Sequence, residues 1–310
     1  MQINDRIGHR LKLHNLHVLM AVVQAGSMNK AAALLNTTQP NVSKSIAELE
    51  RTVGVRLLDR NAGGVEPTAY GRALLNGGIA VFGELRQALK SIEFLADPTA
   101  GEVRIGCNPF LAPSFVSAVV DRLSRRCPRI EFHIVTGRVE HLHHELSDRN
   151  VDFLITRRSG LLAGMGFEFL FGEPYVVVAG TQSPWSRRRR IAFAELLGES
   201  WTLPPPGSVI ATVATEGFLA SGLDYPRAAV VTDSATTRIS LAATGRFLTI
   251  LQASALRFPT RQPEIKALPV EPRMADTPIG VITLKNRTLS PVATLFIEHA
   301  REVAKPLAKK

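Results

Sequence analysis

A short run of polar side chains near the N-terminus has the types and spacing to recognise the base edges of a nucleic acid. The run consists of Gln39, Asn41, Ser43 and Lys44. Gln and Asn can each form two hydrogen bonds with adenine, Ser can donate or accept, and Lys can bind guanine or a phosphate. A surface helix that serves only stability usually carries paired Glu and Lys, whereas this one opens with uncharged hydrogen-bonding groups. The run predicts a helix that reads duplex DNA; an ordinary polar helix face is the alternative.

Two short helices joined by a tight turn, between Gln24 and Arg60, must present this run. Ser27 is expected to cap the first helix and Thr38 the second, because a hydroxyl can accept from the unpaired amides of an opening turn. Pro40 is tolerated in the first turn of the second helix. A buried stripe at helical spacing follows, made of Val42, Ile46, Leu49 and Val53. The pattern is typical of a helix-turn-helix, although a helical pair in a globular core would also produce it.

A two-stranded wing is predicted after the second helix. Residues 56–60 and 65–67 read as strands around a glycine turn. Contacts from such a wing go to phosphates or the minor groove, and they give register more than sequence choice. The residues expected to contact DNA are Ser27, Thr37, Thr38, Gln39, Pro40, Asn41, Ser43, Lys44 and Arg60.

The same stretch resembles the N-terminal signature of LysR-type transcriptional regulators. The residues that carry the resemblance are colinear and without gaps: Gly26-Ser27, Lys30-Ala31-Ala32, Leu35, Thr38-Gln39-Pro40, Val42-Ser43, Ile46, Leu49-Glu50, Gly54-Val55 and Leu57-Leu58-Asp59-Arg60. The resemblance implies a sequence-specific regulator that binds a double-stranded operator as a homodimer or homotetramer. It also implies control by a small-molecule effector, no other cofactor, and RNA polymerase as a further partner to consider.

Composition and charge fit a soluble protein with a polyanionic partner. The chain has 310 residues, 45% of them apolar, and a formal net charge of +10. Residues 1–97 carry only +3 of that charge, so the DNA assignment depends on the motif rather than on a basic N-terminal region. No apolar run approaches the roughly 20 residues that span a bilayer, and the N-terminus lacks the pattern of a secretory signal. Two cysteines are too few for a disulfide framework, so the expected location is the cytoplasm.

A long helix is predicted over residues 70–95. Its apolar residues alternate steps of four and three, which is typical of a heptad seam: Leu74, Gly78, Val81, Leu85, Ala88, Ile92 and Leu95. In the resembled family this linker helix forms the dimer contact, which assigns dimerisation to Leu74, Val81, Leu85 and Ile92. Packing against the helix's own chain is the alternative, and Gly77-Gly78 indicates a close helix approach or a kink.

Beyond a hinge at residues 97–101, predicted strands alternate with helices, which indicates a doubly wound α/β domain. Two lobes connected by two crossings resemble periplasmic binding proteins, the effector domain of this family. The predicted fold is therefore α/β overall, with an N-terminal winged helix-turn-helix, a long linker helix and a two-lobed effector domain. The expected boundaries are 1–68, 69–97 and 98–310, with lobe I at about 102–170 and 271–310 and lobe II at about 171–270.

Loops beyond the carboxyl ends of strands should line a ligand cleft between the lobes. The candidate effector-binding residues are Cys107, Asn108, Phe110, Thr136, Arg138, Thr156, Arg157 and Ser208. Arg138 and Arg157 could hold a carboxylate with paired donors, and Ser208 could cap the next helix or touch a ligand. An organic acid or a sugar is the expected effector class, although each residue singly could serve only loop structure.

Other interpretations stay open at this point. An α/β enzyme, or a solute-binding protein with an appended helical domain, would share the strand and helix pattern, but no nucleophile elbow, P-loop or dinucleotide loop is evident. His141, His143, His144 and Glu145 suggest a metal site, yet no second ligand cluster accompanies them. Cys107 could sense thiol chemistry or simply be small, and the run at 187–190 could be a solvated loop or a DNA contact.

Overall fold

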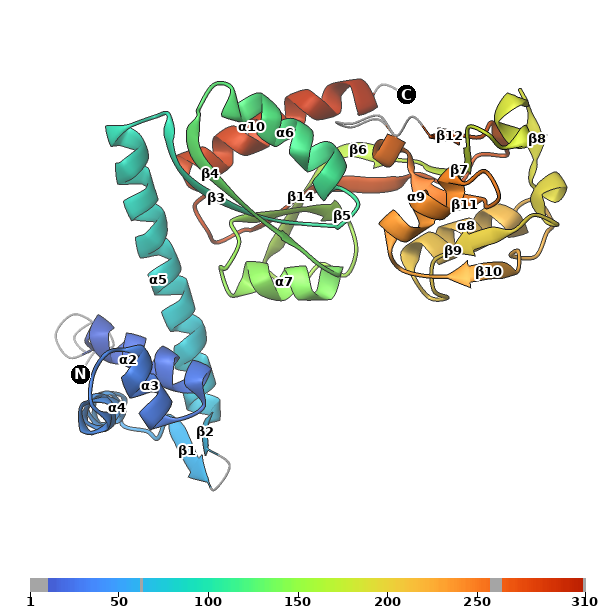
Figure 1. Ribbon diagram of the computed structural model, residues 1–310. Helices are drawn as coiled ribbons and strands as arrows, with labels where there is room; N and C mark the ends of the chain where they lie inside the picture. The colour runs from blue at the N-terminus through green and yellow to red at the C-terminus, as the bar shows by residue number, and fades with distance from the viewer. Residues whose placement is uncertain (1–10, 62–63, 257–263, 309–310) are drawn as a thin grey trace. The chain divides into compact units, whose positions relative to one another are not determined.

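The computed structural model describes residues 11–61, 64–256 and 264–308, and the chain forms two compact units that divide between Gln87 and Ala88. The elements of the first unit (Figure 1) are α2 Leu13–Ala25, α3 Met28–Leu34, α4 Gln39–Val53, β1 Leu58–Asn61, β2 Gly64–Pro67 and the first part of α5 Ala69–Ala96. The predicted helix pair and wing are therefore present at the expected positions.

Helices α2, α3 and α4 enclose the core of the first unit. Its fully buried side chains include Leu19, Val22, Ala31, Val42, Ile46 and Leu49. Gly26 and Gly54 adopt the left-handed conformation that ends α2 and α4. Ser27 and Thr38 occupy the predicted N-cap positions, but neither hydroxyl makes a capping hydrogen bond, so that part of the prediction is wrong.

The wing is an antiparallel pair with Leu58 opposite Pro67 and Asn61 opposite Gly64. The amide of Val65 donates to the carbonyl oxygen of Gly26 at 3.1 Å, and a Cβ at Gly64 would lie 2.7 Å from that oxygen. Glycine at position 64 thus allows the wing to dock on the turn between α2 and α3.

Side chains of α5 contribute to a core in each unit. In the first unit, Leu74 and Phe82 pack against the helix-turn-helix core. A Cβ at Gly78 would lie 3.1 Å from Leu16 Cδ1, whereas one at Gly77 would meet nothing within 4 Å. The predicted close helix approach is confirmed at Gly78. Leu74, which the sequence assigns to the dimer seam, is half-buried against the core of its own unit.

Lobe I of the second unit has a five-stranded sheet in the order β4-β3-β5-β14-β6. Its elements are β3 Ala100–Cys107, η1 Ala112–Val116, α6 Ser117–Ser124, β4 Arg129–Thr136, α7 Val139–Ser147, β5 Phe153–Arg157, β6 Met165–Glu173, β14 Thr277–Leu284 and α10 Pro291–Ala308. Helices α6 and α10 lie together on one face, and α7 lies on the other (Figure 1). Strands β3, β4 and β5 are parallel as predicted, but β14 runs antiparallel to both of its neighbours, β5 and β6, so the sheet is mixed rather than doubly wound throughout.

Lobe II follows the first crossing at Pro174. Its elements are β7 Tyr175–Gly180, η2 Pro184–Arg187, β8 Ile191–Ala192, η3 Phe193–Leu196, β9 Trp201–Leu203, α8 Val209–Leu219, β10 Ala228–Val231, α9 Ala235–Ala243, β11 Thr249–Gln252, η4 Ala253–Leu256, β12 Ile265–Ala267 and β13 Val270–Glu271. Strand β7 pairs with β11 and β12, β9 pairs with β10, and a bridge between Trp201 and Leu248 connects the two groups. Helix α8 covers one face of these strands and α9 the other. The chain returns to lobe I through residues 272–276.

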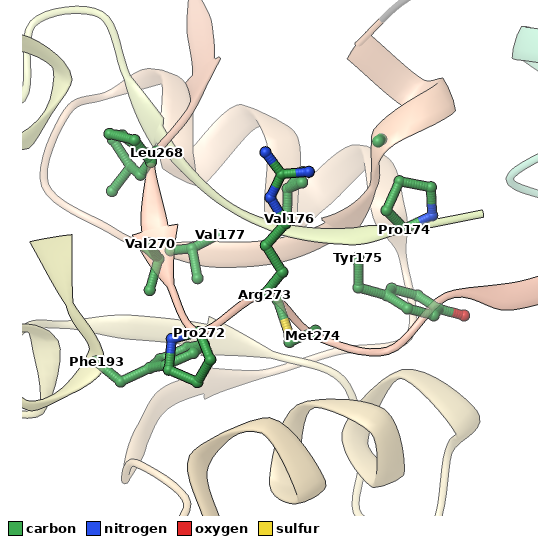
Figure 2. Close-up of a pocket in the computed structure, with 12 residues that line it drawn as sticks. Pro174, Tyr175, Val176, Val177, Phe193, Leu268, Val270, Pro272, Arg273 and Met274 are labelled. Atoms are coloured by element: carbon green, nitrogen blue, oxygen red, sulfur yellow. The ribbon is translucent and has the colours of Figure 1, made fainter. Parts of the chain in front are cut away.

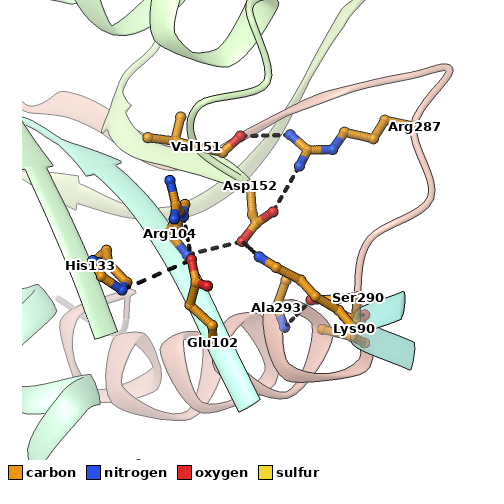
Figure 3. A network of polar contacts seen from close by, with 10 residues as sticks. Lys90, Glu102, Arg104, His133, Val151, Asp152, Arg287, Ser290 and Ala293 are labelled. Atoms are coloured by element: carbon orange, nitrogen blue, oxygen red, sulfur yellow. Dashed lines mark hydrogen bonds and ion pairs between the residues drawn. The ribbon is translucent and has the colours of Figure 1, made fainter. Parts of the chain in front are cut away.

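A buried ion network holds the last turns of α5 in lobe I (Figure 3). Asp152 accepts from Lys90 Nζ at 3.2 Å and from Arg287 Nη2 at 2.7 Å. The same carboxylate accepts from the amide of Arg104 at 2.9 Å, and Arg287 also donates to the carbonyl oxygen of Val151 at 2.6 Å. Because these three charged side chains are almost fully buried, the carboxylate is needed to balance both cations.

Candidate functional site

The start of α4 presents the predicted polar run to solvent. Gln39, Asn41 and Lys44 are exposed and Ser43 is half-buried, while the opposite side of the helix fills the core. Gln39 Nε2 donates to Ser43 Oγ at 2.9 Å, and Asn41 Nδ2 donates to Thr37 Oγ1 at 3.3 Å. These bonds between residues four apart hold the side chains in order, and they can be exchanged for hydrogen bonds to bases without burying an unpaired group.

The other residues expected to contact DNA lie around this helix in the same unit. Thr37, Thr38 and Pro40 are exposed beside the run, and Ser27 is half-buried just after the turn at Gly26. Arg60 lies on β1, but its side chain is outside the described part of the chain. Glu50 fixes the start of the wing, because its Oε1 accepts from the amides of Leu57 at 2.8 Å and Leu58 at 3.4 Å.

The strand ends of lobe I bring part of the predicted effector set together. Cys107 is paired with Thr136 on β4 and with Ile155 on β5, so the ends of three parallel strands meet at one edge. Asn108 shapes the following turn, because its Oδ1 accepts from the amide of Phe110 at 2.9 Å. Cys107 is fully buried, and burial raises the pKa of its thiol to about 12.

The other four predicted effector residues lie in environments that range from exposed to buried. Arg138 is exposed at the N-cap of α7, and the buried hydroxyl of Thr156 has no hydrogen-bond partner among the described residues. Burial lowers the pKa of Arg157, an effect opposed by Tyr175. Ser208 caps α8, since its Oγ accepts from the Ala211 amide at 3.2 Å, so the structure shows the capping role that the sequence had left open.

Arg238 on α9 is a functional candidate that sequence reasoning missed. Its side chain is fully buried, and its Nη1 donates to the carbonyl oxygen of Ile250 at 2.9 Å. The guanidinium carbon lies 5.5 Å from the centroid of the Phe110 ring, which comes from lobe I. Burial lowers the pKa of Arg238 to about 10, against the opposing effect of Tyr225 and other groups. The sequence signal was the position of a lone Arg four residues before Ala242, on the apolar face of a helix of small residues.

Two tyrosines accompany this arginine. The buried hydroxyl of Tyr225 has no partner among the described residues, and burial raises its pKa to about 12 despite the opposing influence of Arg238. The hydroxyl of Tyr175 accepts from Gln252 Nε2 at 3.4 Å, and burial raises its pKa as well. A cation and neutral hydroxyls in a dry environment can bind an anion, because hydrogen bonds are stronger where water is excluded.

A separate cavity of about 510 Å³ lies where the chain crosses between the lobes (Figure 2). It is lined mainly by apolar side chains, including Val177, Phe193, Leu268, Val270, Pro272 and Met274, with Tyr175 and Arg273 among them. A neighbouring cavity of about 450 Å³ shares Pro174 and Arg273 with it. Both volumes are in the range of small-molecule sites, and both border the segments that connect the lobes.

Comparison with known proteins gives the family. Residues 13–72 match "Bacterial regulatory helix-turn-helix protein, lysR family", and residues 96–305 match "LysR substrate binding domain". The chain belongs to the LysR family. This LysR-type protein is a transcriptional regulator with a helix-turn-helix DNA-binding domain and an effector-binding domain, and it is not an enzyme.

Relatives and solved structures agree with this assignment. The chain is 26% identical over 295 residues to the HTH-type transcriptional regulator GbpR of Azospirillum brasilense, covering 94% of this chain and 86% of that protein. A full-length OxyR variant from Pseudomonas aeruginosa has the same fold, with a TM-score of 0.70, 19% identity and coverage of 97% and 99%. Full-length CbnR in complex with its target DNA gives a TM-score of 0.56 at 22% identity, with coverage of 95% and 100%.

Two other clusters of this LysR-type regulator that the sequence suggested as sites are the histidines of α7 and the arginine run at 187–190. His143 is buried in α7, while His141 is exposed and lies 4.0 Å from Glu145. Within the described ranges, no group of three or more His, Cys, Asp or Glu side chains could hold a metal ion. In the arginine run, Arg188 pairs with Glu195 at 2.7 Å and Arg190 pairs through its Nε with the carboxylate of Glu271 at 2.8 Å. None of the helices in the described part of the chain has the length and apolar character needed to span a membrane.

Proposed function

We propose that this LysR-type regulator reads its operator through the first turns of α4, in response to a small molecule bound in the second unit. The observation that carries the proposal is the exposed run that begins at Gln39, whose polar groups are already ordered by their own hydrogen bonds. The N-terminal part of the second helix of a helix-turn-helix meets base edges in the major groove. CbnR, which shares the fold, has been solved in complex with its target DNA, and this supports DNA as the partner here.

The test of DNA reading is a footprint and gel shift with the upstream region of the protein's own gene. We expect a protected site and a lower Kd for that duplex than for a random duplex of equal length. Affinity should fall steeply with salt concentration, because lysines and arginines that contact phosphates release counterions. Equal affinity for both duplexes at every salt concentration would contradict sequence-specific binding.

Assembly as a homodimer or homotetramer is proposed from the apolar stripe on α5. The exposed members of the stripe are Val81 (43%), Leu85 (44%), Ile92 (62%) and Leu95 (80%), and Leu89 (62%) is a further exposed apolar residue beside them. An exposed apolar face at heptad spacing is typical of a helix that packs against another helix. Leu74, at the start of the predicted seam, is half-buried against the core of its own unit.

A charge placed in the stripe tests this assembly. Leu85→Glu should convert the full-length protein to monomers in light scattering after size exclusion, because burying an unpaired carboxylate is costly. Asn76→Glu is the matched control, since Asn76 is exposed and lies nine residues away, on the opposite face at 3.6 residues per turn. Monomers for both variants, or an unchanged assembly for Leu85→Glu, would move the interface elsewhere.

The effector is proposed to be an organic acid or a sugar bound between the lobes, with no other cofactor. Support comes from the polar groups at the ends of the strands in both lobes and from Phe110, which reaches from lobe I to the core of lobe II. A ligand that binds one arrangement of the lobes more tightly than another shifts the population, and this is sufficient for regulation. We propose the cytoplasm as the location, where the operator lies, and RNA polymerase as a further partner.

Thermal-shift titration of the full-length protein tests the effector proposal. We expect at least one class, small acids or sugars, to raise the Tm in a saturable way, as ligand binding to the folded state requires. The same compound should change the gel shift of the operator. A stabilising compound that leaves DNA binding unchanged would not be the effector.

A further inference from the structure

The fully buried guanidinium of Arg238 has hydrogen-bond donors that nothing in the described structure uses. Its Nε and Nη2 have no partner, while its Nη1 is bonded to Ile250. We infer that Arg238 binds the carboxylate of a small monocarboxylic acid, and that this contact defines the chemical class of the effector. The inference rests on the proposed regulatory function of the second unit. It narrows the proposed effector class from organic acids or sugars to acids with one carboxylate.

The geometry of the unused donors fits a carboxylate. The hydrogens of Nε and Nη2 lie on one edge of the planar guanidinium, and that edge can bind both oxygens of a carboxylate at once. The same chain contains an example of this arrangement on its surface. Arg301 donates from Nε to Glu168 Oε1 at 2.7 Å and from Nη2 to Glu168 Oε2 at 2.9 Å. On Arg238 the same edge is unpaired, and no carboxylate of the described residues lies upon it; because neighbouring protein atoms cover both nitrogens, a ligand reaches them only when those neighbours move.

A core that served only stability would not be expected to carry such a group. A buried charge without a paired counterion costs several kcal/mol, and a well-packed apolar side chain in its place is often neutral or stabilising. Phe110 offsets a part of that cost, because a cation within about 6 Å of a ring is attracted to its face. Asp233 and the two tyrosines influence Arg238 electrostatically, but no hydrogen bond to the free edge comes from them.

Groups on the sheet face that α9 covers favour a monoanion as the ligand. Thr202 on β9 and Thr249 on β11 lie on the face of the sheet that α9 covers, because they alternate with Trp201 and Ile250 of the opposite core. Both hydroxyls are buried without partners in the described residues. One guanidinium with neutral hydroxyls balances a single negative charge, whereas a phosphate dianion would need more cations.

Binding at this position would act on the contact between the lobes. Phe110 belongs to lobe I and stacks on Arg238 of lobe II, and η1 of lobe I also contacts η4 of lobe II. An acid that pairs with the free edge of Arg238 competes with the attraction between this guanidinium and the ring. The acid therefore has different affinities for lobe arrangements that differ at Phe110, as regulation requires.

The experiment is a thermal-shift titration of the full-length protein with benzoate, phenylacetate and butyrate, each beside its amide. We expect a saturable rise in Tm with at least one acid and none with its amide. The shift should be lost in Arg238→Gln and retained in Arg246→Gln. Arg246 is the matched control, because it is an exposed arginine of the same lobe whose guanidinium carbon lies 5.6 Å from the ring centroid of Phe247. Inorganic phosphate is the competing anion and should give no saturable shift.

A purely structural arginine is distinguished by a second variant. Arg238→Met should fold with a ligand-free Tm equal to or above that of the wild type, since it removes an unpaired buried charge, and it should lose the acid response. If Arg238→Met lowered the Tm of the ligand-free protein and left the acid-induced rise in Tm unchanged, Arg238 would serve only the packing of the core. No response of the wild type to any of the three acids, equal responses to acid and amide, or an equal response to phosphate would each overturn the inference.

Failure of the inference is separable from failure of the proposed function. The operator gel shift of the wild type is run in parallel without any acid, with Arg246→Gln as the control variant that should bind the duplex equally. Loss of specific DNA binding by the wild type would refute the proposed function. Retained DNA binding with no acid response would refute only the carboxylate site.

Discussion

Polar side chains are exposed to solvent at the start of α4, whereas a charged side chain on α9 is fully buried. On α4 the polar run beginning at Gln39 is exposed, and its members bond to each other or to water at little cost. At α9 the guanidinium of Arg238 is fully buried with part of its donors unused. The exposed polar run on α4 can be predicted from residue spacing along one helix. The buried surroundings of Arg238 form only because a helix, two strands and a loop from the other lobe meet.

This contrast indicates where substitutions should affect stability and where they should affect only recognition. An exposed polar side chain is solvated in both the folded and the unfolded state, so its removal changes the free energy of unfolding little. A buried charge is balanced by specific partners, and removing one partner leaves the others uncompensated.

Removing the buried carboxylate of the α5 network should have the largest effect. Asp152→Ala leaves Lys90 and Arg287 without their shared carboxylate, and we expect a loss of about 3–5 kcal/mol in the free energy of unfolding. The measurement is urea unfolding of the full-length protein followed by circular dichroism. Asp121→Ala is the control, because Asp121 forms an exposed pair with Arg125 and should cost no more than about 1 kcal/mol. Equal losses for the two variants would remove the contrast between buried and exposed charges.

Substitutions in the polar run of α4 should affect recognition and leave stability unchanged. Gln39→Ala and Ser43→Ala should each reduce the preference for operator over random DNA, by about 1–3 kcal/mol where a bidentate contact to a base is lost. Competition gel shifts measure the preference, and thermal unfolding should show almost no change. Asn76→Ala removes an exposed amide from α5 and should leave the preference intact. Unchanged preference in the Gln39 and Ser43 variants would place base reading elsewhere.

The adjacent glycines of α5 should respond differently to the same substitution. Gly77→Ala should stabilise the protein by about 0.5–1 kcal/mol, because alanine is the better helix former and its methyl group meets nothing within 4 Å. At Gly78 the methyl group would lie 3.1 Å from Leu16 Cδ1, so the gain should be cancelled or reversed. Urea unfolding of the two variants measures the difference. An equal gain at both positions would show that α5 does not approach α2 closely in solution.

The smallest effect is expected for alkylation of Cys107 in the folded protein. With a pKa of about 12, only about one thiol in ten thousand is ionised at pH 8, and the side chain is fully buried. Iodoacetamide at pH 8 should therefore leave Cys107 unmodified in the folded protein and alkylate it in urea, as measured by mass spectrometry of peptides. Because the thiolate fraction rises with pH, the folded protein should become reactive only at strongly alkaline pH. Rapid alkylation at pH 8 would restore thiol sensing as an interpretation.

Features that depend on neighbours along the chain were predictable from the sequence. The stripe that includes Val42 and Ile46 follows from helical spacing, and the structure buries it as expected. The convergence of Cys107 and Thr136 at one sheet edge follows from the general topology of parallel strands, and their pairing confirms it. The predicted wing also agrees, because a glycine turn between two short strands is a local signal.

Features that depend on contacts distant in sequence were not predictable. Strand β6, Met165–Glu173, was missed because glycines and glutamates interrupt its apolar pattern, and only its pairing with β14 makes it a strand. Leu74 has the spacing of a dimer seam, yet its side chain is used by its own domain. Helical spacing places Arg238 on an apolar helix face, but nothing local in the sequence indicates that Phe110 from the other lobe will cover it.

One backbone hydrogen bond bears on the choice of operator. The Val65 amide bonds to the Gly26 carbonyl, so the wing and the turn before Ser27 form one rigid piece with a fixed span between them. Under the proposed DNA contacts, a duplex must match that span or deform to fit it. Base pairs between the two contacts would then influence affinity through the stiffness and groove width of the DNA, although no side chain touches them.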